Sequence, residues 1–321
     1  MNIVSLIGGL LLLVGGGELL VRGAAGLALK AKIPSIIVGL TVVSIGTSSP
    51  ELFASLNAAA SGADGIAIGN VVGSNMANLG LVLAITALVF PIPVEKNLLK
   101  LDWPVMMVAS LLFLLFMQDL ELVWWEGLIF VLALIFYIFR LIYITRRNNK
   151  MQAELTSDEK EFEEFQSKPY WVLIVLVVVG CTLLYFGAEW FIEGASNIAM
   201  SLGISDTVIG LTVVAFGTSV PELVTSLMAA FKKETDIGLG NLVGSNIFNI
   251  LAVLGITSLV SPLDMKPEPL EPNFIHNQIW WMFAISFVIM PFVLIGKNKI
   301  GRVKGLILLA AYITYIFLVL T

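Results

Sequence analysis

One segment of this chain occurs twice, and this repeat constrains the fold more than any other feature. GLTVVSIGTSSPEL begins at Gly39, and GLTVVAFGTSVPEL begins at Gly210, 171 residues later. At the same separation, IGNVVGSNMANLGLVL from Ile68 matches LGNLVGSNIFNILAVL from Leu239 without a gap. A repeat this long indicates duplication, so the two halves of the chain are expected to fold as copies of one unit.

The composition places these copies in a membrane. Of the 321 residues, 58% are hydrophobic and only 13% are charged, whereas soluble chains carry about 25% charged residues. Lipid must therefore solvate most of the surface. We expect an all-α membrane protein, and nucleic acid is not expected as a partner.

Hydrophobic runs predict ten transmembrane helices, five in each copy. They lie near residues 3–26, 35–61, 66–90, 102–117, 122–144, 170–200, 206–231, 237–262, 277–295 and 301–320. The first five-helix repeat is assigned to residues 1–145 and the second to residues 170–321. Between them, residues 146–169 form a polar segment with an acidic run, which predicts a solvated cytoplasmic linker.

Basic residues predict the orientation of these helices. With ten spans, every Lys and Arg except Lys266, out of 18, falls on one side of the membrane. Basic loops stay in the cytoplasm, so both termini are expected outside the cell, in the plasma membrane. Because each copy has an odd number of spans, the second copy must be inverted relative to the first. Inverted repeats are the architecture of secondary transporters.

Two glutamates of the repeated motif lie halfway along apolar runs. A carboxylate at that depth is costly, so Glu51 and Glu222 point to a functional site. No Lys or Arg lies at that depth, which leaves a bound cation or a proton as the partner. A threonine and a serine precede each glutamate by four and three residues, on the same helical face. These residues are Thr47, Ser48, Thr218 and Ser219.

The next helix of each copy adds a serine and an asparagine at i and i+4, Ser74 with Asn78 and Ser245 with Asn249. The combined set offers carboxylate, hydroxyl and amide oxygens without nitrogen or sulfur. Hard cations such as Ca²⁺ and Na⁺ take such ligands.

Proline is expected to break both motif helices and to add main-chain oxygens. Pro50 and Pro221 lack an N–H, so each frees the carbonyl four residues earlier, at Gly46 and Gly217. Broken helices whose carbonyls face a cavity are how transporters bind alkali ions.

Other residues are given structural roles. Gly69, Gly73, Gly240 and Gly244 are expected to serve close helix packing. Glu18 can pair with Arg22 at i+4, but Glu193 replaces Arg22 in the second copy, so we assign Glu18 and Glu189 a structural or gating role.

Enzyme chemistry finds little support in the sequence. Cys181 is the only cysteine and His276 the only histidine, which leaves no thiolate cluster and makes Ser-His catalysis a poor fit. An intramembrane hydrolase is therefore a weak alternative, and a cation channel would not need inverted repeats. The chain is not expected to be an enzyme.

The duplicated GTSxPE and GNxxGSN elements resemble the alpha repeats of the calcium/cation antiporter superfamily, and the whole chain is most similar to its prokaryotic sodium/calcium exchangers. The resemblance implies ten helices, alternating access, and a binding cluster formed by helices 2, 3, 7 and 8. It implies Ca²⁺ ligands at Glu51 and Glu222 and at the main-chain oxygens of Thr47 and Thr218. For Na⁺ it adds Ser48, Ser74, Ser219, Ser245, the carbonyls of Ser44 and Ala215, and the region between Asn78 and Asn249.

The resemblance also separates the branches. Asn249 stands where some prokaryotic relatives and the potassium-dependent branch carry Asp, which argues against K⁺ co-transport. The proton/calcium branch usually has a glutamate in its GN motif, which is absent from GNVVGSN and GNLVGSN. The expected function is Na⁺/Ca²⁺ antiport, and an H⁺/Ca²⁺ or other cation exchanger is the closest alternative. No cofactor is expected, only transported Ca²⁺ and Na⁺, and a monomer is the expected working unit.

Overall fold

The computed structural model describes residues 2–94, 98–148, 168–201, 215–265, 272–295 and 298–320. Within these ranges, seven helices are long and apolar enough to span a membrane, and the bent pair formed by residues 35–47 and 49–60 makes an eighth candidate. The chain is therefore an all-helical protein of the multi-pass membrane type. The count of ten spans stays a prediction, since residues 206–214 of the seventh and most of the linker lie outside the described residues.

The chain forms two compact units, which differ from the predicted halves. The first unit combines residues 1–47 and 141–241, and the second combines residues 48–140 and 242–321. The elements of the first unit are α1 (Asn2–Ala31), α2 (Ser35–Val38), the π-helix η1 (Gly39–Val43), α3 (Ser44–Thr47), the end of α8 (Trp124–Asn148), α10 (Tyr170–Ser201), α12 (Ala215–Thr218), α13 (Val220–Phe231) and the start of α14 (Thr235–Phe248).

The second unit contains the remaining helices and four two-residue strands. In chain order these are α4 (Ser49–Ala60), α5 (Asp64–Ala77), η2 (Asn78–Val82), α6 (Leu83–Val89), β1 (Ile92–Pro93), η3 (Leu98–Asp102), α7 (Trp103–Phe116), η4 (Met117–Asp119), β2 (Glu121–Leu122), most of α8, the end of α14, η7 (Asn249–Leu254), α15 (Gly255–Val260), β3 (Leu263–Asp264), α16 (Pro272–Ile295), β4 (Lys299–Ile300) and α17 (Arg302–Leu320). β1 pairs antiparallel with β4, and β2 pairs antiparallel with β3, so these pairs connect segments that lie between helices.

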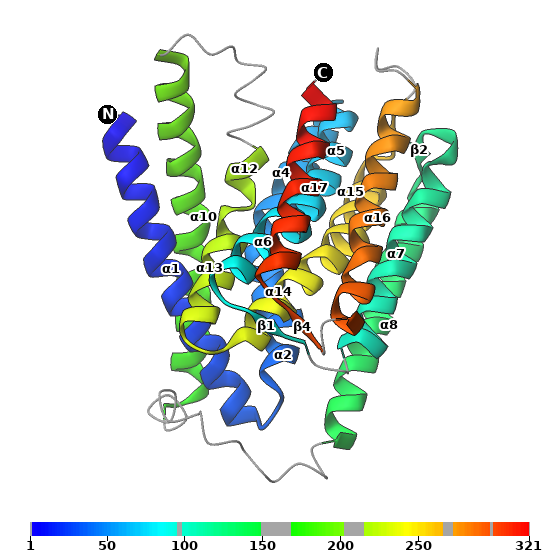
Figure 1. The fold of residues 1–321 in the computed structure, drawn as a ribbon. Coiled ribbons are helices and arrows are strands. Elements are labelled where there is room, and N and C mark those ends of the chain that lie inside the picture. The colour runs from blue at the N-terminus through cyan, green and yellow to red at the C-terminus, as the bar shows by residue number, and fades with distance from the viewer. Residues whose placement is uncertain are drawn as a thin grey trace. The chain divides into compact units, whose positions relative to one another are not determined.

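In the first unit, α1 and α10 run antiparallel along a glycine seam (Figure 1). A Cβ built on Gly16 would lie 2.9 Å from the carbonyl oxygen of Gly180, and one on Gly9 would lie 2.8 Å from that of Gly187. Small residues allow such close backbone approach between membrane helices. Gly9 and Gly16 are the repeat equivalents of Gly180 and Gly187, so the equivalent helices of the two copies pack in opposite directions.

Equivalent residues also form equivalent turns. The turn after α4 has a left-handed residue at Gly62 (φ 73°), and the turn after α13 has one at Lys233 (φ 62°), 171 residues later. In both turns, two N–H groups at the end of the helix donate hydrogen bonds to carbonyl oxygens of its last turn, with the same spacing in each copy. For example, the N–H of Gly62 donates to the carbonyl of Ala59, and the N–H of Lys233 donates to the carbonyl of Ala230. This is the Schellman helix ending, and it shows that the duplication extends to the backbone conformation.

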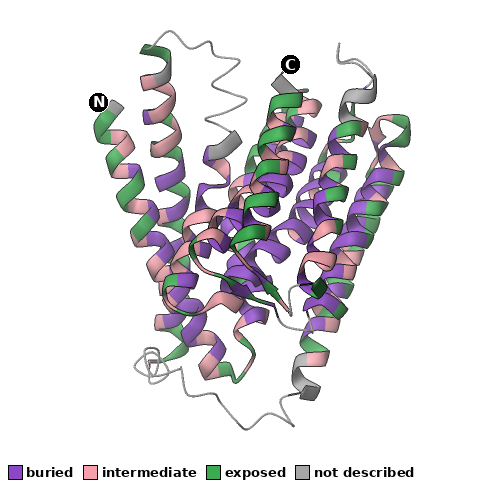
Figure 2. Ribbon diagram, in the orientation of Figure 1, coloured by how far each residue is buried: buried purple, intermediate pink, exposed green. Residues whose placement is uncertain are grey.

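The distribution of apolar and polar side chains between surface and interior is the reverse of that in a soluble protein. Along α8, α10 and α17, exposed residues alternate with buried ones, whereas α5 and α14 are largely buried (Figure 2). Large apolar side chains such as Phe136 and Phe139 on α8 are 71% and 69% exposed. Buried polar side chains are instead concentrated in the repeated motifs. Apolar outside and polar inside is the arrangement expected of helices surrounded by lipid.

Candidate cation site

Both motif helices are broken at the predicted place. Between α3 and α4, Ser48 takes φ −91° and ψ 4°, and between α12 and α13, Ser219 takes φ −90° and ψ 0°. The first pair of helices bends by 41° at this break. Proline follows two residues later in each copy, where it cannot donate the hydrogen bond that would continue the preceding helix. The expectation of broken motif helices is confirmed.

The breaks place each glutamate in the first turn of a helix. Glu51 lies in the first turn of α4 and Glu222 in that of α13, and both have 0% exposure. The N-terminus of a helix carries a partial positive charge that favours a carboxylate. That dipole offsets only part of the cost of burying an ionised group. Carboxylates are also oxygen ligands that hard cations prefer.

In the second unit, Asn70 attaches the Glu51 helix to α5. Its Nδ2 donates to the main-chain oxygen of Glu51 at 3.1 Å and to Ser55 Oγ at 3.0 Å. Ser55 in turn donates to the carbonyl of Ala67 at 3.3 Å. These bonds fix the first turns of α4 against α5 and thereby hold the backbone that carries Glu51.

In the first unit, Thr47 donates from its hydroxyl to Asn241 Oδ1 at 3.0 Å. Ser44 donates to the carbonyl of Leu40 at 2.9 Å, so its hydroxyl is used within its own helix. The expected ligand at Ser44 is its carbonyl oxygen, and this hydrogen bond of the hydroxyl does not involve that atom. Thr225 and Ser226 lie further along α13 than Glu222, and both are buried. Their hydroxyl oxygens form no hydrogen bond with another described residue.

Four asparagines meet in the second unit. Asn78 Nδ2 donates to Asn246 Oδ1 at 3.1 Å, and Asn249 Nδ2 donates to Asn75 Oδ1 at 3.1 Å. Asn75 and Asn246 also donate to each other's main-chain oxygens, both at 3.3 Å. We call these four residues the asparagine ring. Because Asn75 and Asn78 are the repeat equivalents of Asn246 and Asn249, each bond has its counterpart from the other copy.

Two of these asparagines begin π-helical segments. The segment η2 starts at Asn78, and η7 starts at Asn249. The wider turn of a π-helix is uncommon and is often found at functional sites. The apolar runs of the sequence do not predict these segments, because a π-turn differs from an α-turn only in one residue of its hydrogen-bond spacing.

Each unit thus gathers part of the predicted site. The second contains Ser48, Glu51, Ser74, Asn78, Ser245 and Asn249, and the first contains Ser44, Thr47, Ala215, Thr218, Ser219 and Glu222. Residues that sequence reasoning missed are Asn70, Asn75, Thr225, Asn241 and Asn246. All except Thr225 are repeated asparagines of the GNxxGSN element, and that repetition was the available signal.

The described residues support the glycine prediction at Gly240. A Cβ on Gly240 would lie 2.6 Å from the carbonyl oxygen of Ile36, so close packing explains that glycine. A Cβ on Gly69 or Gly73 would meet no described atom within 4 Å. Close packing at these two residues of α5 stays a prediction, because the repeat equivalents of Ile36 and Leu40, residues 207 and 211, lie outside the described residues.

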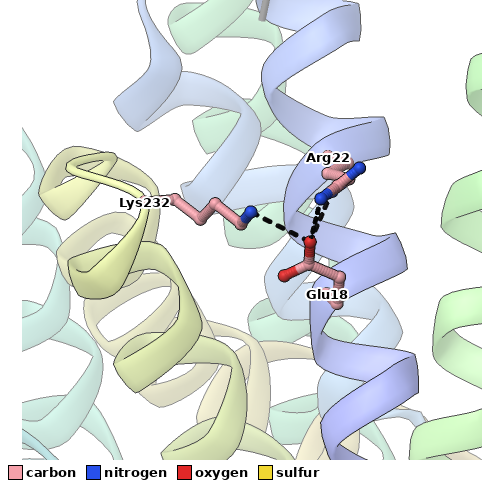
Figure 3. Close-up of polar contacts among 3 residues, drawn as sticks. All are labelled: Glu18, Arg22 and Lys232. Atoms are coloured by element: carbon pink, nitrogen blue, oxygen red, sulfur yellow. Dashed lines mark hydrogen bonds and ion pairs between the residues drawn. The ribbon is translucent and has the colours of Figure 1, made fainter. Parts of the chain in front are cut away.

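Glu18 has two cationic partners rather than the single expected one. It forms an ion pair with Arg22 on α1, and Lys232 Nζ at the end of α13 lies 2.9 Å from the same carboxylate (Figure 3). The structure thus confirms the i+4 pair and adds a bond from α1 to α13. This cluster belongs to the packing of the first unit.

The chemistry offered by the described residues is that of oxygen ligation. Among them, no group of three or more His, Cys, Asp or Glu side chains is arranged to hold a metal ion. The motif residues instead supply one carboxylate per copy with hydroxyl, amide and main-chain oxygens. Such sites suit hard cations that are bound and released, since fewer charged ligands give weaker binding.

Comparison with known proteins agrees with this chemistry. The family described as sodium/calcium exchanger protein matches residues 1–143 and 172–321. The putative antiporter CaxA of Alkalimonas amylolytica is 36% identical, with 97% of this chain and 96% of the relative covered. The sodium/calcium exchanger MaX1 of Methanosarcina acetivorans is 35% identical, with 98% and 97% covered.

A solved structure of the sodium-calcium exchanger NCX_Mj, soaked with Na⁺ and Ca²⁺, has the same fold. It superposes with a TM-score of 0.82 at 33% identity, covering 98% of this chain and 97% of that one. Since both the family and the fold match over nearly the whole length, the chain belongs to the sodium/calcium exchanger family.

Proposed function

We propose that this protein exchanges Na⁺ for Ca²⁺ across the plasma membrane by alternating access, electrogenically and without K⁺. The observation that carries the proposal is the pair of fully buried glutamates, each in the first turn of a broken helix, in a member of the sodium/calcium exchanger family. Buried carboxylates without a use would be strongly disfavoured in a membrane protein.

Each ligand has a proposed role. Glu51 and Glu222, with the main-chain oxygens of Thr47 and Thr218, bind Ca²⁺. Na⁺ uses these groups together with the serine hydroxyls, the carbonyls of Ser44 and Ala215, and the region of Asn78 and Asn249. The serines are Ser48, Ser74, Ser219 and Ser245.

Charge balance then couples the two ions. Two ionised glutamates balance one Ca²⁺, whereas about three Na⁺ on the same oxygens would leave one net positive charge. Competition for shared carboxylates is sufficient for exchange, because Na⁺ and Ca²⁺ cannot both be bound. Without a cation, the negative charges oppose occlusion, so the loaded protein is the form that crosses between the two access states.

The proposed architecture is ten helices in two inverted five-helix repeats, with both termini outside. The antiparallel packing of α1 and α10 along equivalent glycines supports the inversion. These two helices are also the proposed moving pair, by analogy with the family. The distribution of Lys and Arg supports the orientation.

The test is Ca²⁺ uptake into proteoliposomes loaded with Na⁺, K⁺ or choline at matched pH. Uptake that requires internal Na⁺ and increases with an inside-positive potential is the expected result, with no change when K⁺ is replaced by choline. One net charge per cycle corresponds to about 2.3 kcal/mol per 100 mV. Uptake driven by a pH gradient in choline would instead assign the protein to proton-coupled exchange. Ca²⁺ flux without any counter-ion would indicate a channel.

A further inference from the structure

Two amide oxygens in the asparagine ring are left as acceptors. Asn78 and Asn249 each use their Nδ2 on the ring, to Asn246 Oδ1 and Asn75 Oδ1. The Oδ1 atoms of Asn78 and Asn249 are buried and accept no hydrogen bond from any described residue. A buried acceptor left without a partner is unfavourable, so two in equivalent positions point to a ligand.

Asn75 and Asn246 determine which atom of each amide is presented. Asn75 Nδ2 donates to the main-chain oxygen of Asn246, and Asn246 Nδ2 donates to that of Asn75. If the Asn75 amide turned over, its nitrogen would face the nitrogen of Asn249 and its oxygen would face the Asn246 carbonyl. Both contacts would be repulsive. The same holds for Asn246, so the hydrogen-bond network itself fixes the amide orientations.

The presented oxygens are neutral. An amide oxygen adds no negative charge to a site, so it favours a monovalent cation more than a divalent one, which needs carboxylates. Metal sites depend strongly on the groups that orient their ligands, and losing such a group typically weakens binding by 10–100-fold. Asn75 and Asn246 have this relation to Asn78 and Asn249.

We propose that Asn75 and Asn246 are positioning residues for a Na⁺ subsite. They touch no ion themselves, but they hold the amides of Asn78 and Asn249 with oxygen rather than nitrogen available to Na⁺. This inference rests on the proposed function and deepens it, because it separates residues needed for Na⁺ from those needed for Ca²⁺.

The test measures ion binding to purified full-length protein through thermal stabilisation by NaCl or CaCl₂, with choline chloride as the salt control. In Asn75→Leu and Asn246→Leu, we expect the Na⁺ concentration for half-maximal stabilisation to rise about 10–100-fold. The Ca²⁺ concentration should stay within about two-fold of wild type, since none of the proposed Ca²⁺ ligands is a member of the ring. The retained Ca²⁺ response also reports that the variant is folded.

Met282→Leu is the matched control. Met282 Sδ lies 3.6 Å from Asn75 Nδ2, but the four amide contacts of the ring do not require it. We expect both ion responses of this variant to match wild type. If the leucine variants fail to fold, Asn75→Ser and Asn246→Ser remove the amide with less added apolar surface and carry the same expectation.

The outcomes separate the two proposals. An unchanged Na⁺ response in the ring variants, or equal weakening for Na⁺ and Ca²⁺, would overturn the positioning role. A wild-type protein that Na⁺ does not stabilise beyond choline would contradict the proposed function itself.

Discussion

Lys232 at the C-terminal end of α13 forms an ion pair with Glu18 on α1, with Nζ and Oε1 2.9 Å apart. Arg22 binds the same carboxylate from the next turn of α1. At the equivalent positions of the repeat, Glu193 of the second copy replaces Arg22, and Ser61 of the first copy replaces Lys232, so neither cation is repeated. The cluster therefore joins the first copy, which contains Glu18 and Arg22, to the second copy, which contains Lys232, and neither cation is present at the equivalent position.

Loss of Glu18 should destabilise the protein more than loss of Lys232. Glu18→Gln leaves two cations without their counter-charge, whereas Lys232→Met leaves Glu18 paired with Arg22. All three side chains are partly exposed, so we expect each pair to contribute only about 0.2–1 kcal/mol. Thermal unfolding of the two variants measures the order. A Lys232→Met variant that is the less stable of the two would show that Arg22 contributes little.

The repeated turn after α4 and α13 gives a prediction about backbone strain. Lys233 holds φ at 62° without being glycine, and a left-handed non-glycine residue costs roughly 1–2 kcal/mol. Lys233→Gly should therefore stabilise the protein by about 1 kcal/mol, reduced by the greater freedom of glycine in the unfolded chain. The melting temperature measures this effect.

Gly62→Ala is the converse variant in the other copy. A Cβ at Gly62 meets no described atom within 4 Å, so only the backbone conformation (φ 73°) opposes the change. We expect a loss of about 1 kcal/mol. If Gly62→Ala and Lys233→Gly shift the melting temperature in the same direction, the left-handed turns do not determine stability at these positions.

Alanine at Gly240 should destabilise the protein. A Cβ on Gly240 would lie 2.6 Å from the Ile36 carbonyl oxygen and 3.1 Å from the Leu40 nitrogen. Separating these backbones should cost about 1–3 kcal/mol. The melting temperature of Gly240→Ala measures this cost. A Gly240→Ala variant with the melting temperature of wild type would contradict the close approach at Gly240.

Much of the fold followed from the repeated sequence. The helix breaks before Glu51 and Glu222 were predictable because proline has no N–H to donate, and burial of both carboxylates followed from their depth in apolar runs. The pairing of Glu18 with Arg22 followed from its i+4 spacing. These features depend on local chemistry, which a sequence displays directly.

The remaining features depend on contacts between distant segments. The division into two units that do not match the repeats, and the bond from Lys232 to Glu18, join residues far apart in the chain. The asparagine ring links Asn75 to Asn246, which are 171 residues apart. Asparagine in a membrane helix is compatible with packing, ligation or positioning, and only its partners distinguish these roles.

The central claim is that Glu51 and Glu222 carry the transported cations. The most direct measurement is Na⁺-driven Ca²⁺ uptake by proteoliposomes containing Glu51→Gln or Glu222→Gln, with the exposed α10 residue changed in Glu193→Gln as a matched control. We predict that each buried variant folds, as judged by size-exclusion chromatography, but loses Ca²⁺ uptake, while Glu193→Gln transports like wild type. Retained uptake in both buried variants would contradict the assignment of the site.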